Sequence, residues 1–253
     1  MIKDYLNLPE KIEGVGSIHP VSILEWEEFY ELAQQFLLFS YDYLKYRLNL
    51  TNIKMFDFLI AILFQSTESD ERVERLTDFQ RLFEIVFKEP VNSFFNPATG
   101  EWLMKVGETG AIHKNNFDQV KSIILRQNLL YEPLTVQDEN AQKFINEHFE
   151  RLSRKGEPPE LESMLAYVSL YKGVTPEQFQ TYTYYQLRVD FEVAQKMDNN
   201  LYIHMYRTQG AKAEPCHVTG KLDVHESPYS IDKIFNKVDG KQDQQLQKMM
   251  SGR

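Results

Sequence analysis

Apolar residues recur every three to five positions along much of the chain, which is the spacing of an amphipathic helix. The first such pattern covers residues 23–48 and follows Ser22 and Glu25, a Ser-x-x-Glu pair that is typical of a helix start. A second and a third helix are expected over 51–65, which is apolar nearly all round, and over 69–89. The N-terminal part is therefore expected to be helical after an extended lead-in.

The pattern then changes to short apolar stretches separated by turn residues. Residues 102–106 and 111–113 flank the sequence Gly-Glu-Thr-Gly and predict a small hairpin with a glycine turn. We place a soft boundary near Asn96, which divides the chain into an N-terminal helical half, 1–96, and a C-terminal half, 97–253. A single continuous domain is the alternative.

Helical patterns return after the hairpin. The expected helices are 115–128, 138–156 and 159–173. Thr183 with Gln186 is a second capping pair and predicts the start of a long helix that ends near Gly210. The chain is thus predicted to be mainly α, a multi-helix bundle-like protein with a small β-hairpin near 101–113 and a short extended C-terminal segment.

The charge of the chain bears on the class of partner. It carries 28 Lys and Arg against 37 Asp and Glu, a net charge of −9. Such a chain repels a phosphate backbone unless a basic patch is present. The basic residues within 143–155 are interleaved with glutamates, a pattern typical of a solvated helix face. No nucleic-acid partner is expected.

The cysteine content and the length of the apolar runs indicate the cellular compartment of the protein. A single cysteine excludes an internal disulfide and fits a reducing compartment. The longest apolar run, Phe58–Phe64, is far shorter than the roughly 20 residues that span a bilayer. The N-terminus lacks the apolar core and cleavage site of a signal peptide. No membrane partner and a cytoplasmic location are therefore expected.

A turn-rich stretch near the C-terminus contains metal-ligand residue types, with Cys216 beside His217 and His225 beside Glu226. A structural zinc site needs four ligands in two spaced pairs, and adjacent residues of an extended chain point to opposite faces. We therefore interpret 216–224 as a strand, and predict no catalytic residue, metal or cofactor. An enzyme that uses Cys216, His217 and His225, the last approaching across a hairpin, is the alternative.

Tyrosines gather on and around the last long helix, at positions 182, 184, 185, 202 and 206. Tyrosine has a large apolar body and a polar tip, and is enriched at interfaces. Two interpretations are open. Half of these rings face the core and half cover it, or together they form an exposed aromatic groove for a partner helix.

The elements expected between residues 112 and 235 follow one another in a characteristic order. A helix ends at Gln127-Asn128, and a short helix leads through Val174-Thr175 to the Thr-x-x-Gln start of a long helix. A glycine-containing return, 218–220, then precedes Ser227-Pro228-Tyr229. About half the chain in this way resembles the tail assembly chaperones of tailed bacteriophages that infect Gram-positive hosts.

The resemblance implies a non-enzymatic protein that binds the helical tape-measure protein, or another phage tail protein, in the host cytoplasm until the tail tube polymerises. A second copy of the chain is a further expected partner. The alternative is a structural virion component, a tail or baseplate adaptor that stays in the mature particle. Composition and helical spacing, not the resemblance, select the residues expected to bind the partner. These are Tyr184, Tyr185, Leu187, Phe191, Tyr202 and Tyr206.

Overall fold

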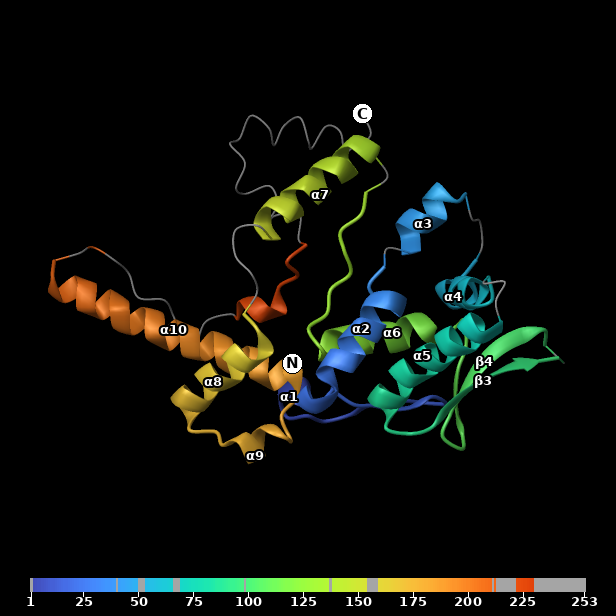
Figure 1. Ribbon diagram of the computed structural model, residues 1–253, viewed down its shortest axis with the longest axis horizontal. Coiled ribbons are helices and arrows are strands. Elements are labelled where there is room, and N and C mark those ends of the chain that lie inside the picture. The colour runs from blue at the N-terminus through green and yellow to red at the C-terminus, as the bar shows by residue number, and fades with distance from the viewer. Residues whose placement is uncertain are drawn as a thin grey trace.

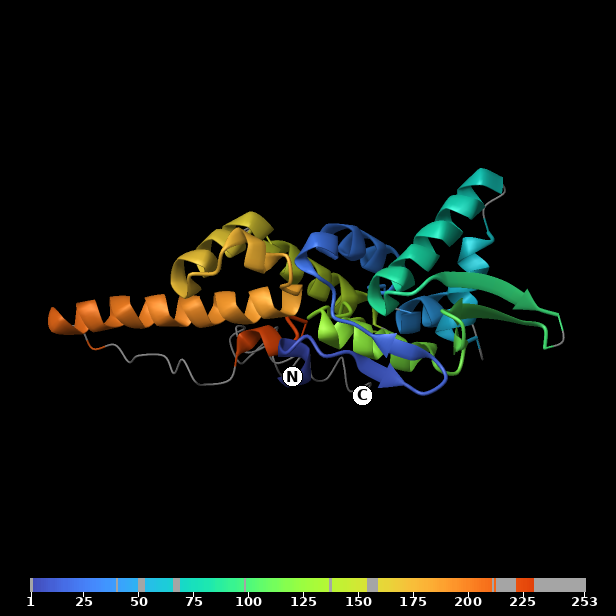
Figure 2. The ribbon, with the colours of Figure 1, turned by 90° about the horizontal axis from the view of Figure 1, so that it is seen from below.

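The computed structural model describes residues 2–39, 41–49, 53–65, 69–97, 99–136, 138–153, 159–210, 212 and 222–229. In these residues the chain is mainly helical, with ten α-helices and two small antiparallel sheets, which confirms the predicted fold class. The molecule is elongated. The long helix α10 (Tyr184–Thr208) projects at one end, and the hairpin of β3 (Val91–Asn96) and β4 (Glu101–Val106) projects at the other (Figure 1, Figure 2).

The N-terminal segment contains more structure than the extended lead-in predicted from the sequence. A short helix, α1 (Ile2–Tyr5), precedes β1 (Glu10–Ile12), which pairs antiparallel with β2 (Gly16–Ile18). The turn between these strands lies against Gly110, where an added Cβ atom would be 1.9 Å from the carbonyl oxygen of Val15. Only glycine fits at this close approach.

The helix predicted over 23–48 is divided, so its predicted extent is wrong. A 3₁₀ turn, η1 (Ile23–Glu25), leads into α2 (Trp26–Phe36), and α3 (Tyr41–Arg47) follows as a separate helix. The four consecutive apolar residues 36–39 all pack in or against the main hydrophobic cluster. Four successive residues of one helix point in all directions, so the chain leaves the helix to bury them together.

The second and third predicted helices are present as α4 (Met55–Leu63) and α5 (Ser69–Phe87). Both contribute to the main hydrophobic cluster, whose buried members extend from Ile12 to Leu130. Phenylalanine dominates its centre. The fully buried rings are Phe29, Phe56, Phe79, Phe83, Phe87 and Phe117.

The three-stranded sheet has the order β3–β4–β5, all antiparallel, with β5 at Gly110–Ile112. The predicted hairpin corresponds to β4 and β5 and is confirmed, while β3 is an additional strand. The boundary expected near Asn96 falls at the end of β3, where the chain turns back to pair with β4. Residues from both sides of this position contribute to the same main cluster.

Four helices follow the sheet in the described residues before α10, and the first three of them are predicted by the sequence. They are α6 (Phe117–Gln127), α7 (Glu139–Ser153), α8 (Leu161–Lys172) and α9 (Pro176–Phe179). A second, smaller hydrophobic cluster holds α8 against α10. Its buried residues are Ile23, Met164, Val168 and Leu187.

The predicted extended C-terminal segment falls largely outside the described residues. Its described part, 222–229, contains a 3₁₀ turn, η2 (Asp223–His225), so a strand that continues to Val224 is wrong. The carboxylate of Glu192 on α10 accepts hydrogen bonds from the backbone N–H groups of Asp223 (2.6 Å) and Val224 (2.7 Å). These two bonds hold the segment against α10.

Candidate functional site

Helix α10 begins at a complete capping box, as the sequence predicts. The backbone N–H of Gln186 donates to the Thr183 hydroxyl (3.2 Å), and the Gln186 side chain accepts from the N–H of Thr183 (2.9 Å). Two otherwise unpaired N–H groups of the first turn are thus satisfied. The helix contains 25 residues, so it is roughly 38 Å long.

The first half of α10 is built into the fold. Leu187 and Ala194 are buried, and Leu187 belongs to the cluster shared with α8. Tyr185 is also buried, and its hydroxyl lies 3.4 Å from Nδ1 of His225. Burial, followed by the charge of Asp4, raises the pKa of Tyr185 to about 12. This half therefore anchors α10 to the rest of the molecule.

The structure separates the six residues predicted to bind a partner. Tyr185 and Leu187 are buried, so in this structure neither side chain is accessible to a partner, contrary to the expectation of an exposed groove. Tyr184 stacks on Trp26, and Phe191 packs against the smaller cluster. These four residues lie where α10 packs on the remainder of the fold. Tyr184 and Phe191 are half-buried, whereas Tyr202 and Tyr206 are 53% and 58% exposed, and a role of any of them in binding stays a prediction.

The second half of α10 presents an uncovered apolar face. Its exposed large hydrophobic residues are Met197, Leu201, Tyr202, Met205 and Tyr206. Leu201 follows Ala194 and Leu187 at intervals of seven, close to two helical turns, so the three lie on nearly the same face. This face is buried at Leu187 and Ala194 and 58% exposed at Leu201.

Figures 1 and 2 show why the exposure changes along one helix. Helix α8 lies over the first half of α10, and the second half projects beyond it. Sequence reasoning missed Met197, Leu201 and Met205. Their four-residue spacing was a signal for a shared face, but the spacing does not show where the covering helix ends.

A polar cluster fixes α1, α8 and α10 together. The buried carboxylate of Asp190 accepts hydrogen bonds from the hydroxyls of Tyr5 (3.0 Å) and Tyr182 (3.1 Å), and from Nζ of Lys172 (2.7 Å). Burial and then the charge of Asp190 raise the pKa values of Tyr5 and Tyr182. Burial opposes protonation of Lys172, but its bond to Asp190 raises the pKa of that ammonium group. Asp190 hydrogen-bonds to each of the other three side chains, so this cluster stabilises the packing of α1, α8 and α10.

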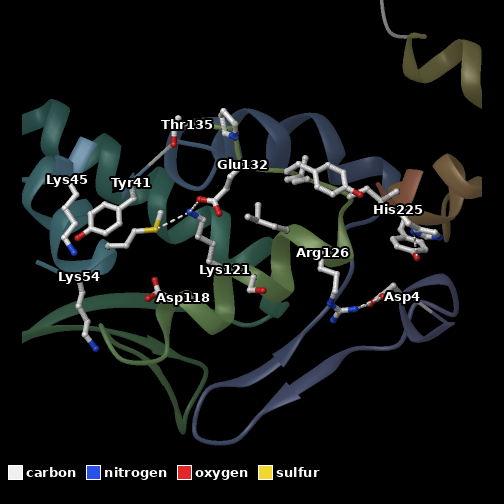
Figure 3. Close-up of a pocket in the computed structure, with 18 of the residues that line it drawn as sticks. Asp4, Tyr41, Lys45, Lys54, Asp118, Lys121, Arg126, Glu132, Thr135 and His225 are labelled. Carbon is white, nitrogen blue, oxygen red and sulfur yellow. Dashed lines mark hydrogen bonds and ion pairs between the residues drawn. The ribbon is translucent and has the colours of Figure 1, made fainter. Parts of the chain in front are cut away.

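An open pocket of about 920 Å³ runs along α6 (Figure 3). Lys121, whose side chain is 6% exposed, forms an ion pair of 2.5 Å with Glu132, and its Nζ lies 3.2 Å from the sulfur of Met55. At the other end of the pocket, Arg126 binds the buried carboxylate of Asp4. The deepest charges of the pocket are therefore paired within the protein, and they fix the segment after α6 and the N-terminus against this helix.

The residues considered for metal or thiol chemistry do not assemble in the described part of the chain. Cys216 and His217 lie outside the described residues, and His225 contacts Tyr185. Within the described ranges, no three His, Cys, Asp or Glu side chains are grouped as a metal site. None of the helices in those ranges has the length and apolar character needed to cross a membrane.

In the described residues, the second half of α10 thus carries an uncovered apolar face, and the buried charges of the polar cluster and of the pocket are paired within the protein. No protein-family model, curated protein or solved structure matches the chain.

Proposed function

We propose that this chain is a helix-binding protein whose partner packs on the second half of α10. One observation carries the proposal: the face of α10 that α8 covers at Leu187 continues, uncovered, through Leu201. A helix from another molecule placed end to end with α8 would bury that continuation in the same way. This is helix-in-groove recognition with anchors spaced by three, four and seven residues.

The energetics favour reversible binding. Complete burial of one large apolar side chain contributes about 1.5–3 kcal/mol. Five such side chains are exposed here, but association costs roughly 4–15 kcal/mol in lost freedom of motion. The favourable free energy of burial exceeds this cost only moderately, so the partner can be bound and later released. The net charge of −9 helps to keep such a complex dissolved.

The identity we propose for the partner comes from the resemblance of residues 112–235 to phage tail assembly chaperones. A tape-measure helix exposes apolar stripes that self-associate, and α10 would cover one of them in the host cytoplasm until tube subunits displace it. The second candidate is a tail or baseplate adaptor, which would use the same face of α10 for a permanent contact in the virion.

The test is capture from phage-infected cells with the tagged full-length chain, with mass spectrometry of the captured proteins and of purified virions. Capture of a long helical tail protein, with this chain absent from virions, supports the chaperone. Presence in virions at fixed copy number supports the adaptor. Failure to capture any phage protein, together with absence from virions, would contradict both.

Two variants on the same face of α10 test whether capture of the partner depends on this helix. Leu201→Ser removes an exposed anchor, so we expect loss of capture with a stability change within about 0.5 kcal/mol. Leu187→Ala lies two heptads earlier on the same face and is buried, so we expect it to cost about 2–5 kcal/mol of unfolding free energy. If Leu201→Ser captures as well as the unchanged protein, α10 is not the binding surface.

A further inference from the structure

The two edges of the three-stranded sheet have different neighbours. At the β5 edge, the N–H of Ala111 donates to the carbonyl of Gly14 (3.0 Å) in the turn between β1 and β2. At the other edge, β3 pairs with β4 alone among the strands of the described residues. The β1–β2 turn thus occupies one edge of the sheet, whereas no strand of the described ranges occupies the other.

The ladder between β3 and β4 shows which backbone groups of β3 face outward. The N–H of Gly107 donates to the carbonyl of Pro90 (3.0 Å), so these two residues form a hydrogen-bonded pair in the register of the two strands. Hydrogen-bonded and non-hydrogen-bonded pairs alternate along antiparallel strands. The N–H and C=O groups of residues 91, 93 and 95 therefore point away from β4.

Helix α5 engages the start of this outward-facing edge. The N–H of Val91 donates to the carboxylate of Glu84 on α5 (3.4 Å). Within the described ranges, the backbone groups of Ser93 and Phe95 have no hydrogen-bond partner outside the β3–β4 ladder. In Figure 2, α5 and the hairpin diverge from the turn that joins them. The outer half of β3 therefore offers two residues whose N–H and C=O groups can pair with another strand.

The side chains of this outer half favour strand pairing. Phe94 and Phe95 are 42% and 49% exposed and lie on opposite faces of β3. The strand reads Val-Asn-Ser-Phe-Phe-Asn, without a charged residue or a proline. Charged residues and prolines are common means by which an exposed edge strand avoids pairing with another chain. Because β3 lacks both, it is an edge to which a further strand can add.

We propose that β3 pairs antiparallel with β3 of a second copy of the chain, across a twofold axis. The register that pairs the free backbone groups of both copies sets Ser93 opposite Phe95 of the second copy, and Phe95 opposite its Ser93. Phe94 then lies on the axis, opposite its own counterpart, at a non-hydrogen-bonded position where cross-strand side chains are closest. The sheets of the two copies become one continuous sheet. The inference does not depend on the proposed function.

A second copy fits this edge because β3 is complementary to itself. In the symmetric register, the two Phe94 rings form an aromatic cross-strand pair, and Asn92 of each copy lies opposite Asn96 of the other. No charged residue of β3 meets a like charge, although each chain carries −9. Helix α10 projects from the opposite end of the molecule, so it lies away from the contact (Figure 1). Two six-residue strands form a small interface, and interfaces below roughly 1,200 Å² are usually transient, so the dimer should dissociate on dilution.

Sedimentation velocity of the full-length chain, at micromolar to submillimolar concentrations, tests for the dimer. The unchanged protein should shift from monomer to dimer as its concentration rises. Phe94→Lys sets two ammonium groups opposite each other on the axis and should remain monomeric throughout. The matched control Leu170→Lys introduces the same charge at an 80% exposed apolar residue of α8 and should dimerise like the unchanged protein. Both positions are exposed, so at low concentration both variants should keep the urea midpoint of the unchanged protein.

Disulfide crosslinking tests the register, in a Cys216→Ser background that removes the only natural thiol of the chain. Phe94→Cys places the two sulfur atoms opposite each other, within reach of a disulfide, so mild oxidation should yield a covalent dimer. Phe95→Cys lies opposite Ser93 of the second copy and only diagonally from its own counterpart. It should therefore give at least tenfold less covalent dimer.

A dimer that Phe94→Lys abolishes and Leu170→Lys keeps, with crosslinking preferred at position 94, would support the inference. A monomer at every concentration would overturn it and leave the edge to a strand of another protein. A dimer that Phe94→Lys retains, or that Leu201→Ser abolishes instead, would also overturn it, because the contact would lie elsewhere. Stronger crosslinking at position 95 than at position 94 would overturn the symmetric register.

Discussion

The ring of Tyr184 stacks on the indole of Trp26, with centroids 3.5 Å apart and planes inclined by 5°. This pair joins the first turn of α10 to the first turn of α2, across 158 positions of sequence. The neighbouring backbone reinforces the joint, because the N–H of Tyr184 donates to the carbonyl of Val21 and the N–H of Ile23 donates to the carbonyl of Tyr182. The base of the projecting helix is thereby fixed to the main core.

Loss of this stack should loosen the base of α10. We expect Tyr184→Ala to lower the free energy of unfolding by about 3 kcal/mol, since a large ring is removed from a packed site. Tyr184→Phe keeps the stacked ring and should cost less than about 1 kcal/mol. Urea denaturation followed by tryptophan fluorescence measures both. Equal stability of the alanine and phenylalanine variants would show that the stack contributes little.

The ion pair between Lys121 and Glu132 should be worth less than its geometry suggests. Lys121→Met leaves an apolar side chain near Met55 and the ring of Phe39, so we expect a change within about 1 kcal/mol. Glu132→Gln leaves the buried ammonium group without its carboxylate and should cost about 1–3 kcal/mol.

A double-mutant cycle decides this prediction. Once Lys121 is methionine, adding Glu132→Gln should have almost no further effect on the midpoint of urea unfolding. A full cost of Glu132→Gln in both backgrounds would mean that Glu132 acts through groups other than Lys121.

Docking of residues 222–229 should depend on pH through Glu192. Burial by itself raises the pKa of this carboxyl, but hydrogen bonds from Lys196 and from the N–H groups of Asp223 and Val224 outweigh burial, and the pKa lies below its usual 4.5. A lowered pKa in the folded state stabilises docking above pH 4.5, and this contribution is lost as pH falls through the folded value.

Hydrogen exchange of the Asp223 and Val224 amides measures this docking. We expect Glu192→Gln to accelerate their exchange about tenfold at pH 7, because hydrogen bonds to a charged acceptor are replaced by weaker ones. The exposed Glu162→Gln on α8 is the control and should leave these amides unchanged. Protection that is the same in the Glu192 variant would show that other contacts hold the segment.

Elements that depend on interactions between residues close in the chain could be predicted from the sequence. The capping pair of Thr183 and Gln186 predicted the start of α10. The glycine turn at residues 107–110 predicted the hairpin of β4 and β5. Both features depend on hydrogen bonds and backbone angles within a few residues. Apolar periodicity likewise predicted α5 and α6. It failed at residues 36–39, where burial of four consecutive apolar side chains against distant elements ended the helix.

Which part of α10 is accessible could not be predicted from the sequence, because it depends on how distant elements pack. Tyr185 and Tyr202 are both tyrosines on the same helix, yet one is 2% exposed and the other 53%. Periodicity assigns residues to a face of a helix but does not say what lies opposite that face. Burial of Tyr185, and the uncovered continuation from Leu187 to Leu201, follow from where α8 and the segment at His225 pack, which depends on contacts between residues far apart in the chain.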